Sequence, residues 1–174
     1  MPDMLSVGQG KQSHSQYRAQ MLLWSVMGAP LILGADIRKL DTFYMSLITA
    51  KEVLAVNADA DVVQGSRLRA HESYEVWGKP ISQRVDKPKG AGNMTEPALV
   101  AVLFNKGSVN ATTVAVQVAA AGGDHGNSDF YPAQISGRFA VRDLLLQKDL
   151  GVFRGSYSQL VPPQDAVMIQ ITPA

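Results

Sequence analysis

The sequence predicts an α/β segment followed by an all-β antiparallel sandwich, with the change near residue 63. Three observations predict this order. Apolar residues recur at helical spacing in the first third, the run "PLILGAD" (30–36) is almost continuously apolar, and apolar residues alternate with period two further on. With 174 residues, 46% of them hydrophobic, the chain has enough apolar mass to bury a core.

The first helix is expected to begin at Ser13, because Ser13 and Gln16 have the spacing of a capping box. Behind this cap, apolar residues recur three or four positions apart and define one inward face: Tyr17, Met21, Trp24 and Met27. Gly28 and Pro30 are expected to end the helix. On this pattern Trp24 belongs to the core.

The run 30–36 predicts a strand that is buried on both faces, as strands of parallel sheets are. Asp36 at its end has two interpretations: a cap for the next element, or a functional group at the carboxyl end of a barrel strand. Asp41 is expected to cap a second helix, and Thr49 with Glu52 resembles another capping box before a short third helix. The order of helix, strand and helix is typical of α/β structure.

Beyond residue 63 the period of the pattern becomes two. Apolar side chains alternate with small or polar ones in two segments, which predicts half-buried strands: Val114, Val116 and Val118, then Val167, Ile169 and Ile171. "YEVWGKPIS" (74–82) and "ALVAVLFNKG" (98–107) predict further strands, whereas "DKPKGAGNMTEP" (86–97) and "GGDHGNSDFYP" (122–132) are expected to be turn-rich loops. Short strands that are separated by turn-rich loops favour an antiparallel sandwich.

Charge and composition argue against several function classes. The 16 basic and 15 acidic residues are spread along the chain and leave a net charge of +1, so no nucleic acid or membrane partner is predicted. The lack of cysteine excludes thiol catalysis, disulfides and cysteine metal sites. The three histidines, His14, His71 and His125, lack the spacing of metal ligands. We therefore predict no metal and no cofactor.

Six segments, in order, resemble the C-terminal part of the α-galactosidases (melibiases) of glycoside hydrolase family 27. They are "PDMLSVG", "YRAQMLLWSVMGAPLILGADIRKLD", "KEVLAVNAD", "VVQG", "YEVWGKPIS" and "AVLFNKG", and the run from Val141 to Pro173 is similar to the last strands of the family. The resemblance extends from Pro2 to Pro173. Two departures stand out: Met1 replaces the Asp that usually precedes this Pro, and "NADADVVQG" replaces a more usual Asn-Gln-Asp-Pro.

The resemblance implies a fold of the last βα units of a (β/α)8 TIM barrel followed by an antiparallel β-sandwich. It implies that residues 1–62 are the C-terminal remnant of the catalytic barrel, with 30–36 as its eighth strand, and that residues 63–174 are the sandwich domain. On this template the chain begins inside a longer polypeptide, in the loop after the seventh strand.

The resemblance also implies a retaining α-galactosidase that hydrolyses terminal α-linked galactose. Such enzymes use a carboxylate nucleophile and a carboxylic acid/base, about 5 Å apart. In the family both are Asp residues on earlier barrel strands, so no catalytic residue is expected here and the isolated chain is expected to be inactive. Asp3 and Met4 match positions that line the galactose site, Asp3 as a hydrogen-bonding group and Met4 as an apolar wall. Without the resemblance, Asp3 is an ordinary Asx turn after Pro2.

The alternative function is a stand-alone, non-catalytic module for carbohydrate binding or interdomain contact. The partner implied by the resemblance is a galactose-terminated saccharide, although the loop that discriminates galactose from N-acetylgalactosamine lies upstream. Apolar barrel surface without its neighbours predicts association into a homo-oligomer. The family is often secreted or lysosomal, and Asn93-Met94-Thr95 and Asn110-Ala111-Thr112 have the pattern of glycosylation acceptors.

Overall fold

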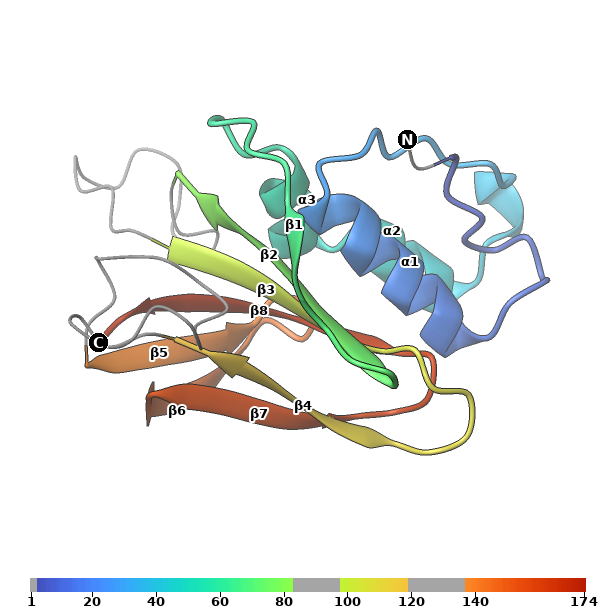
Figure 1. Cartoon of the computed structure of the whole chain (residues 1–174). Helices are drawn as coiled ribbons and strands as arrows, with labels where there is room; N and C mark the ends of the chain where they lie inside the picture. Colours follow the sequence, from blue (N-terminus) through green and yellow to red (C-terminus); the bar gives the residue numbers. More distant parts are fainter. Residues whose placement is uncertain (1–2, 83–97, 119–136) are drawn as a thin grey trace.

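The computed structural model describes residues 3–82, 98–118 and 137–174. The described chain has three layers (Figure 1): helices cover one face of a six-stranded sheet, and a two-stranded sheet covers the other face. Both predicted loops, 86–97 and 122–132, lie wholly outside the described residues, as do His125 and the Asn93 acceptor pattern.

The helical layer follows the predicted order. Its elements are α1 (His14–Val26), the 3₁₀ helix η1 (Ile37–Lys39), α2 (Thr42–Ile48) and α3 (Lys51–Asn57). The capping box of α1 is confirmed: Ser13 Oγ accepts a bond from the Gln16 amide, and Gln16 Oε1 accepts one from the Ser13 amide. Asp41 caps α2 by accepting a bond from the Tyr44 amide at 3.0 Å.

The second predicted capping box is wrong. The residue before α3 is Ala50, which makes no side-chain cap, and Thr49 Oγ1 instead donates to the carbonyl of Met45 in the preceding helix. Thr hydroxyls compete for such i−4 carbonyls when they lie at the end of a helix. Glu52, expected to complete the box, is held by an arginine of the sandwich, as described below.

The predicted buried strand at 30–36 is also wrong in its extent. Only Leu33 forms a β-bridge, parallel to Leu5, through bonds from the Leu5 amide to the Ile32 carbonyl and from the Gly34 amide to the Leu5 carbonyl. The side chain of Ile32 is 58% exposed. Among the described residues the segment is paired along one side only, so it lacks the two neighbours that bury a parallel strand.

The strand pattern of the second part is confirmed. The strands are β1 (Ser66–Ala70), β2 (Tyr74–Ile81), β3 (Ala98–Asn105), β4 (Thr112–Gln117), β5 (Arg138–Asp143), β6 (Lys148–Arg154), β7 (Ser156–Val161) and β8 (Ala166–Pro173). The larger sheet has the order β1-β2-β3-β8-β5-β6, the smaller sheet pairs β4 with β7, and these strand pairings are antiparallel. The antiparallel sandwich is therefore confirmed.

Two hydrophobic cores lie on opposite faces of the six-stranded sheet. The helix-side core joins α1, α2 and α3 to the near face of the sheet and contains, among others, Tyr17, Met21, Leu22, Val53, Val100, Val102 and Met168. The sandwich core lies between the sheets and contains, among others, Val76, Leu103, Val114, Val116, Phe139, Ile169 and Ile171. Strand β8 contributes to both, so the prediction that it is half-buried is wrong: α1 covers the face that alternation alone assigns to solvent.

Candidate functional site

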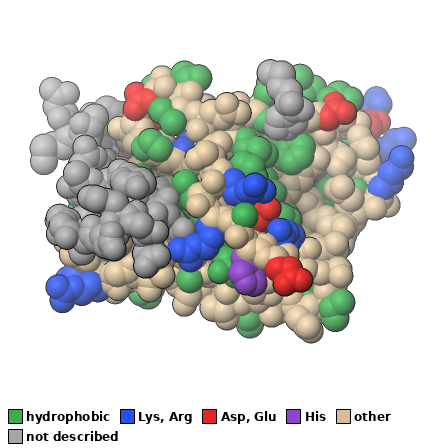
Figure 2. Space-filling view, in the orientation of Figure 1, with side chains coloured by type: hydrophobic (Ala, Val, Ile, Leu, Met, Phe, Trp, Pro, Cys, Tyr) green, Lys and Arg blue, Asp and Glu red, His purple; other side chains and the backbone are tan. Residues whose placement is uncertain are grey.

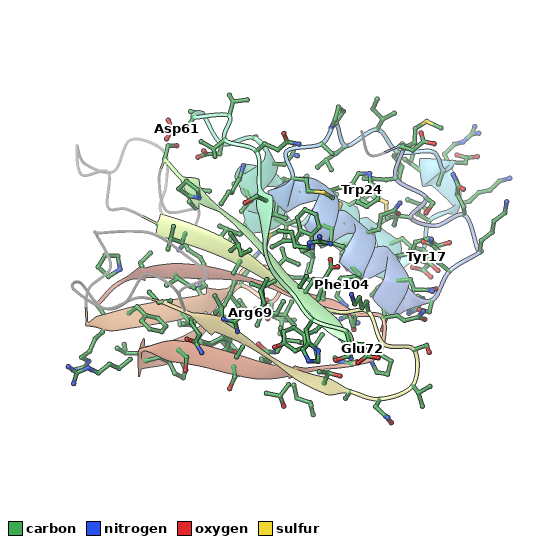
Figure 3. All side chains as sticks on the ribbon, in the orientation of Figure 1. Tyr17, Trp24, Asp61, Arg69, Glu72 and Phe104 are labelled. Carbon is green, nitrogen blue, oxygen red and sulfur yellow. The ribbon has the colours of Figure 1, made fainter. Side chains whose placement is uncertain are left out.

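The loop that precedes α1 holds the two residues proposed to contact sugar. The Asp3 carboxylate accepts a bond from the next amide, that of Met4, at 2.7 Å, and the Asp3 carbonyl accepts one from Trp24 Nε1 at 2.7 Å. An Asx turn bonds to the amide two residues on, so the observed bond differs from that alternative. The tether to Trp24, which lies along α1 (Figure 3), fixes the backbone of Asp3.

The side chain of Met4 is 53% exposed and lies beside residues 30–36, which we call the bridge segment because Leu33 forms the β-bridge to Leu5. Its Cε is 3.8 Å from the place that a Cβ on Gly34 would occupy. The methyl group of Met4 thus lies next to Gly34. Asp3 therefore offers one carboxylate and Met4 one apolar surface. These two groups suit the binding of a ligand, whereas glycoside hydrolysis needs a pair of carboxyl groups.

The rest of this loop is anchored to α1 by side chains. Gln20 Oε1 accepts bonds from the amide and the hydroxyl of Ser6, both at 3.0 Å, and the Tyr17 hydroxyl accepts bonds from the amides of Lys11 and Gln12. Gly8 has φ +82°, and a Cβ there would collide with Leu40. The loop therefore has a defined path from Leu5 to the helix.

Asp36 is a cap and not a free functional group. Its Oδ1 accepts a bond from the Arg38 amide at 3.1 Å, and its carboxylate is paired in a bidentate manner with the Arg38 guanidinium at 2.9 Å. The bonds from Arg38 hold the pKa of the Asp36 carboxyl below its ordinary value. The structure thus supports the first of the two interpretations of this residue.

The two described histidines make aromatic contacts. His14 stacks on Phe43 with ring centroids 4.0 Å apart, and His71 stacks on Tyr74 at 4.6 Å. Within residues 3–82, 98–118 and 137–174, no group of three or more His, Asp or Glu side chains is arranged to hold a metal ion. In the same ranges, no helix combines the length and apolar character needed to cross a membrane.

Acidic and basic side chains lie next to one another on the face shown in Figure 2. Glu75 of β2 accepts a bond from Trp77 Nε1 at 2.9 Å and is paired with Arg67 at 3.2 Å and Lys106 at 3.5 Å. These contacts fasten β1 and the end of β3 to β2. Trp77 packs against the helix-side core, with its indole nitrogen occupied by the carboxylate.

Two arginine–carboxylate pairs join the helices to the sandwich, and sequence reasoning missed both. Arg18 of α1 donates two bonds of 2.8 Å to Asp165, which is only 3% exposed. Arg142 of β5 donates bonds of 2.8 and 2.9 Å to Glu52 of α3. Glu52 and Asp149 raise the pKa of Arg142. The pairs are separated by 147 and 90 residues, so local spacing gives no signal for them.

The parallel bridge between Leu5 and Leu33, with α1 as the crossover, is the arrangement of a βαβ unit, and an antiparallel sandwich follows it. Comparison with known proteins agrees with this class of structure. Residues 1–59 match the family model described as alpha galactosidase A, and residues 71–171 match the model for the alpha galactosidase C-terminal beta sandwich domain. The chain belongs to the alpha-galactosidase family.

Individual relatives show what share of a full-length family member the chain covers. The chain is 34% identical to "Probable alpha-galactosidase" of Dictyostelium discoideum over 99% of its own length and 40% of the relative. It is 30% identical to "Alpha-galactosidase" of Oryza sativa subsp. japonica over 99% of itself and 35% of the relative. The crystal structure of alpha-galactosidase I from Mortierella vinacea shares the fold, with TM-score 0.76, 24% identity, and coverage of 99% and 40% of the two chains. The chain thus spans well under half of these proteins and corresponds to their C-terminal portion.

Proposed function

We propose that the chain serves as the C-terminal portion of a retaining α-galactosidase that hydrolyses terminal α-linked galactose from a saccharide. The observation that carries this proposal is the match of both family models, in order, along one chain whose helices and sandwich share a core. In this proposal the carboxylate nucleophile and the acid/base are two Asp residues on polypeptide upstream of residue 1, placed about 5 Å apart.

The contribution of this chain to catalysis is then binding and support. Asp3 presents its carboxylate to the sugar pocket, and Met4 presents an apolar surface against the sugar ring. The bond from Trp24 to the Asp3 carbonyl supports this role, because a binding residue is more effective when its backbone is fixed before the ligand arrives. The sandwich holds α1 and α3 in place through Asp165 and Arg142.

A chimera tests this proposal. The N-terminal part of the Dictyostelium discoideum relative, up to the start of its match, would be fused to residues 2–174 of this chain. We expect the chimera to hydrolyse an aryl α-galactoside and the 174-residue chain alone to show no turnover, because in this proposal both catalytic carboxylates lie outside it. In the chimera, Asp3→Ala should raise KM more than it lowers kcat, and exposed Asp149→Ala is the matched control.

Two outcomes would overturn the proposal. A folded chimera, verified by circular dichroism, that shows no hydrolysis would mean that this chain does not support α-galactoside hydrolysis. Heat-labile release of the aryl group by the isolated chain would mean that the catalytic carboxylates are within it. Unchanged KM in Asp3→Ala would remove Asp3 from the sugar site and leave the family assignment standing.

We also propose that the isolated chain associates with itself. Met4, Ile32 and Ile37 are each more than half exposed in the helical region, where the bridge segment has a partner on one side. Exposed apolar surface of this kind favours association. Light scattering should give a mass above 18.7 kDa, and a monomer at all accessible concentrations would contradict this part of the proposal.

A further inference from the structure

A cavity of about 270 Å³ lies between the helical layer and the sandwich. Its walls come from the end of α1, from α3, from the segment before β1 and from β2. That segment follows Asp61, labelled in Figure 3, at the opposite end of the molecule from Tyr17. The volume corresponds to about nine water molecules, at about 30 Å³ for each in the liquid. Cavities where two structural units meet are frequent sites for small ligands.

The one charged side chain among the described residues that line this cavity is Lys79 of β2. Lys79 alternates with Gly78 and Pro80, so it lies on the same face of β2 as Trp77 and Ile81, which belong to the helix-side core. The residue is only 2% exposed. A lysine this buried is rare unless its ammonium group is paired.

Within the described ranges, the Lys79 ammonium group has no hydrogen-bond acceptor and no ion-pair partner. Asp59 attracts this ammonium group and favours its charged form. Burial has the larger effect, however, and it lowers the pKa of Lys79 below its ordinary value. The described residues therefore compensate the charge of this ammonium group only in part.

One carboxylate oxygen of Asp59 is already hydrogen-bonded to another residue. Its Oδ1 accepts bonds from the amide and the hydroxyl of Ser82, at 2.9 and 2.6 Å. Its Oδ2 is buried and has no partner among the described residues. Asp59 is not among the residues that line the cavity, whereas Lys79 is.

The remaining walls are mainly apolar. Met27, Ala29, Pro30, Val62 and Val63 provide the hydrocarbon surface. Asn57 also lines the cavity, but its amide nitrogen already donates to the Ala29 carbonyl at 2.8 Å. The cavity thus combines one buried cation with apolar surface, which is the complement of a carboxylate that carries a short hydrocarbon chain.

We propose that this cavity binds a small monocarboxylate, with the carboxylate on Lys79 and the hydrocarbon chain against Val62, Val63 and Pro30. A charge-assisted hydrogen bond supplies the acceptor that the ammonium group lacks. A neutral hydroxyl compensates the charge less well, and a polyol would leave its own hydroxyls against apolar walls. The proposal concerns residues other than Asp3 and Met4, so it does not depend on the proposed hydrolase activity.

Butyrate and 1-butanol are matched probes, because they share a hydrocarbon chain and differ in charge. Binding to the 174-residue chain would be measured by ligand-observed NMR at constant ionic strength. We expect butyrate to bind at millimolar concentrations and 1-butanol to bind at least about tenfold more weakly, since hydrogen bonds to charged groups are among the strong ones. Lys79→Met should weaken butyrate binding by a similar factor. Lys148→Met, which changes an exposed lysine of β6 in the same sheet, should leave it unchanged.

A titration of the unmodified chain gives a second test that needs no variant. Butyrate stays ionised above neutral pH, so its binding should weaken as pH rises through the pKa of Lys79 and the ammonium group loses its proton. The charged group that faces Lys79 is Asp59, and the other described lining residues are uncharged. Equal binding of butyrate and 1-butanol, equal binding by Lys79→Met, pH-independent binding, or no binding at all would each overturn the proposal; the last would leave a cavity that holds water only.

Discussion

The two cores on either side of the six-stranded sheet differ in where their residues come from. The sandwich core takes all its buried members from residue 76 onward. The helix-side core combines α1, α2 and α3 with β2, β3 and β8, and thus joins the segments matched by two family models. Bidentate pairs that involve Arg18 and Arg142 fasten the helices to the sandwich.

This difference shows that a boundary in sequence pattern need not be a boundary in packing. The change of period near residue 63 marks where helices give way to strands, yet α1 contacts both β3 and β8. Met168 of β8 is 0% exposed because helices cover its face of the sheet. We propose that residues 1–62 are the C-terminal remnant of a catalytic barrel and residues 63–174 a sandwich domain, and that the helical unit depends on the sandwich for its stability.

Hydrogen exchange should show the largest contrast, between the bridge segment of the helical unit and the central strands of the sandwich. Amides of residues 29–36 should exchange orders of magnitude faster than those of residues 98–104 and 165–172, because the bridge segment is paired on one side while β3 and β8 are central strands. Exchange followed by mass spectrometry on dilute, verified monomer measures this. Equal and strong protection of all three segments would show that the bridge segment is as stable as the sandwich.

Truncation of a helix-side core residue should have the next largest effect. Leu22 of α1 is 0% exposed, and Leu22→Ala should lower the free energy of unfolding by about 2–5 kcal/mol. Because the helix-side core includes one face of β3 and β8, the change should shift the main unfolding transition in urea and not a separate early one.

Leu103→Ala is the matched change in the sandwich core, since Leu103 is also 0% exposed. We expect both variants to lower the midpoint of the same transition. If Leu22→Ala produced a separate transition and left that of the sandwich in place, the helices would be an independent unit and the comparison between the two cores would fail.

The ion pair between α1 and the start of β8 should give a smaller effect. Asp165→Asn leaves Arg18 without its carboxylate, and we expect a loss of about 1–3 kcal/mol because Arg18 is partly exposed and regains some hydration. The control is Asp149→Asn, since Asp149 is 80% exposed and pairs with Arg142 at the surface; we expect at most about 0.5 kcal/mol. Equal losses in the two variants, measured by urea unfolding, would show that the buried pair stabilises the fold no more than the exposed pair does.

Local sequence signals predicted the parts of the fold that depend on neighbours along the chain. The cap at Ser13, the cap at Asp41 and the alternation at Val114 and Val116 each need only a few residues, and the structure confirms them. The strand predicted at 30–36 failed because burial of a parallel strand depends on neighbours on both sides, which spacing along the chain does not report.

The candidate site was less predictable from local sequence signals than the caps and the alternating strands. Asp3 and Met4 came from resemblance alone, and their role in sugar binding stays a prediction. Arg142 and Lys79 gave no signal, because an arginine or lysine in an alternating strand has the same pattern whether it faces water or a covering helix. Glu52 did give a signal, but its distance from Thr49 favoured a local capping box over a partner 90 residues away.

The smallest predicted effect concerns Asp143, at the end of β5 near both cores. Burial raises the pKa of this carboxyl above its ordinary value, although the amides of Leu145 and Leu146 donate to it at 3.0 and 2.8 Å and Arg18 also favours the charged form. The folded state therefore binds this proton more tightly than the unfolded state. The contribution of Asp143 is most favourable below its unfolded pKa and is lost as pH rises through the higher folded pKa.

Asp143→Asn removes this proton and keeps an oxygen that can accept both amide bonds. We therefore subtract the free energy of unfolding of the unmodified chain from that of the variant. This difference should increase as pH rises from acid to neutral. Urea unfolding at a series of pH values measures the difference, with exposed Asp149→Asn as the control. The change should be modest, because two amide bonds offset part of the cost of burying the charge. If the difference between Asp143→Asn and the unmodified chain were constant with pH, burial would not perturb this carboxyl, and the end of β5 would be more hydrated than its 3% exposure indicates.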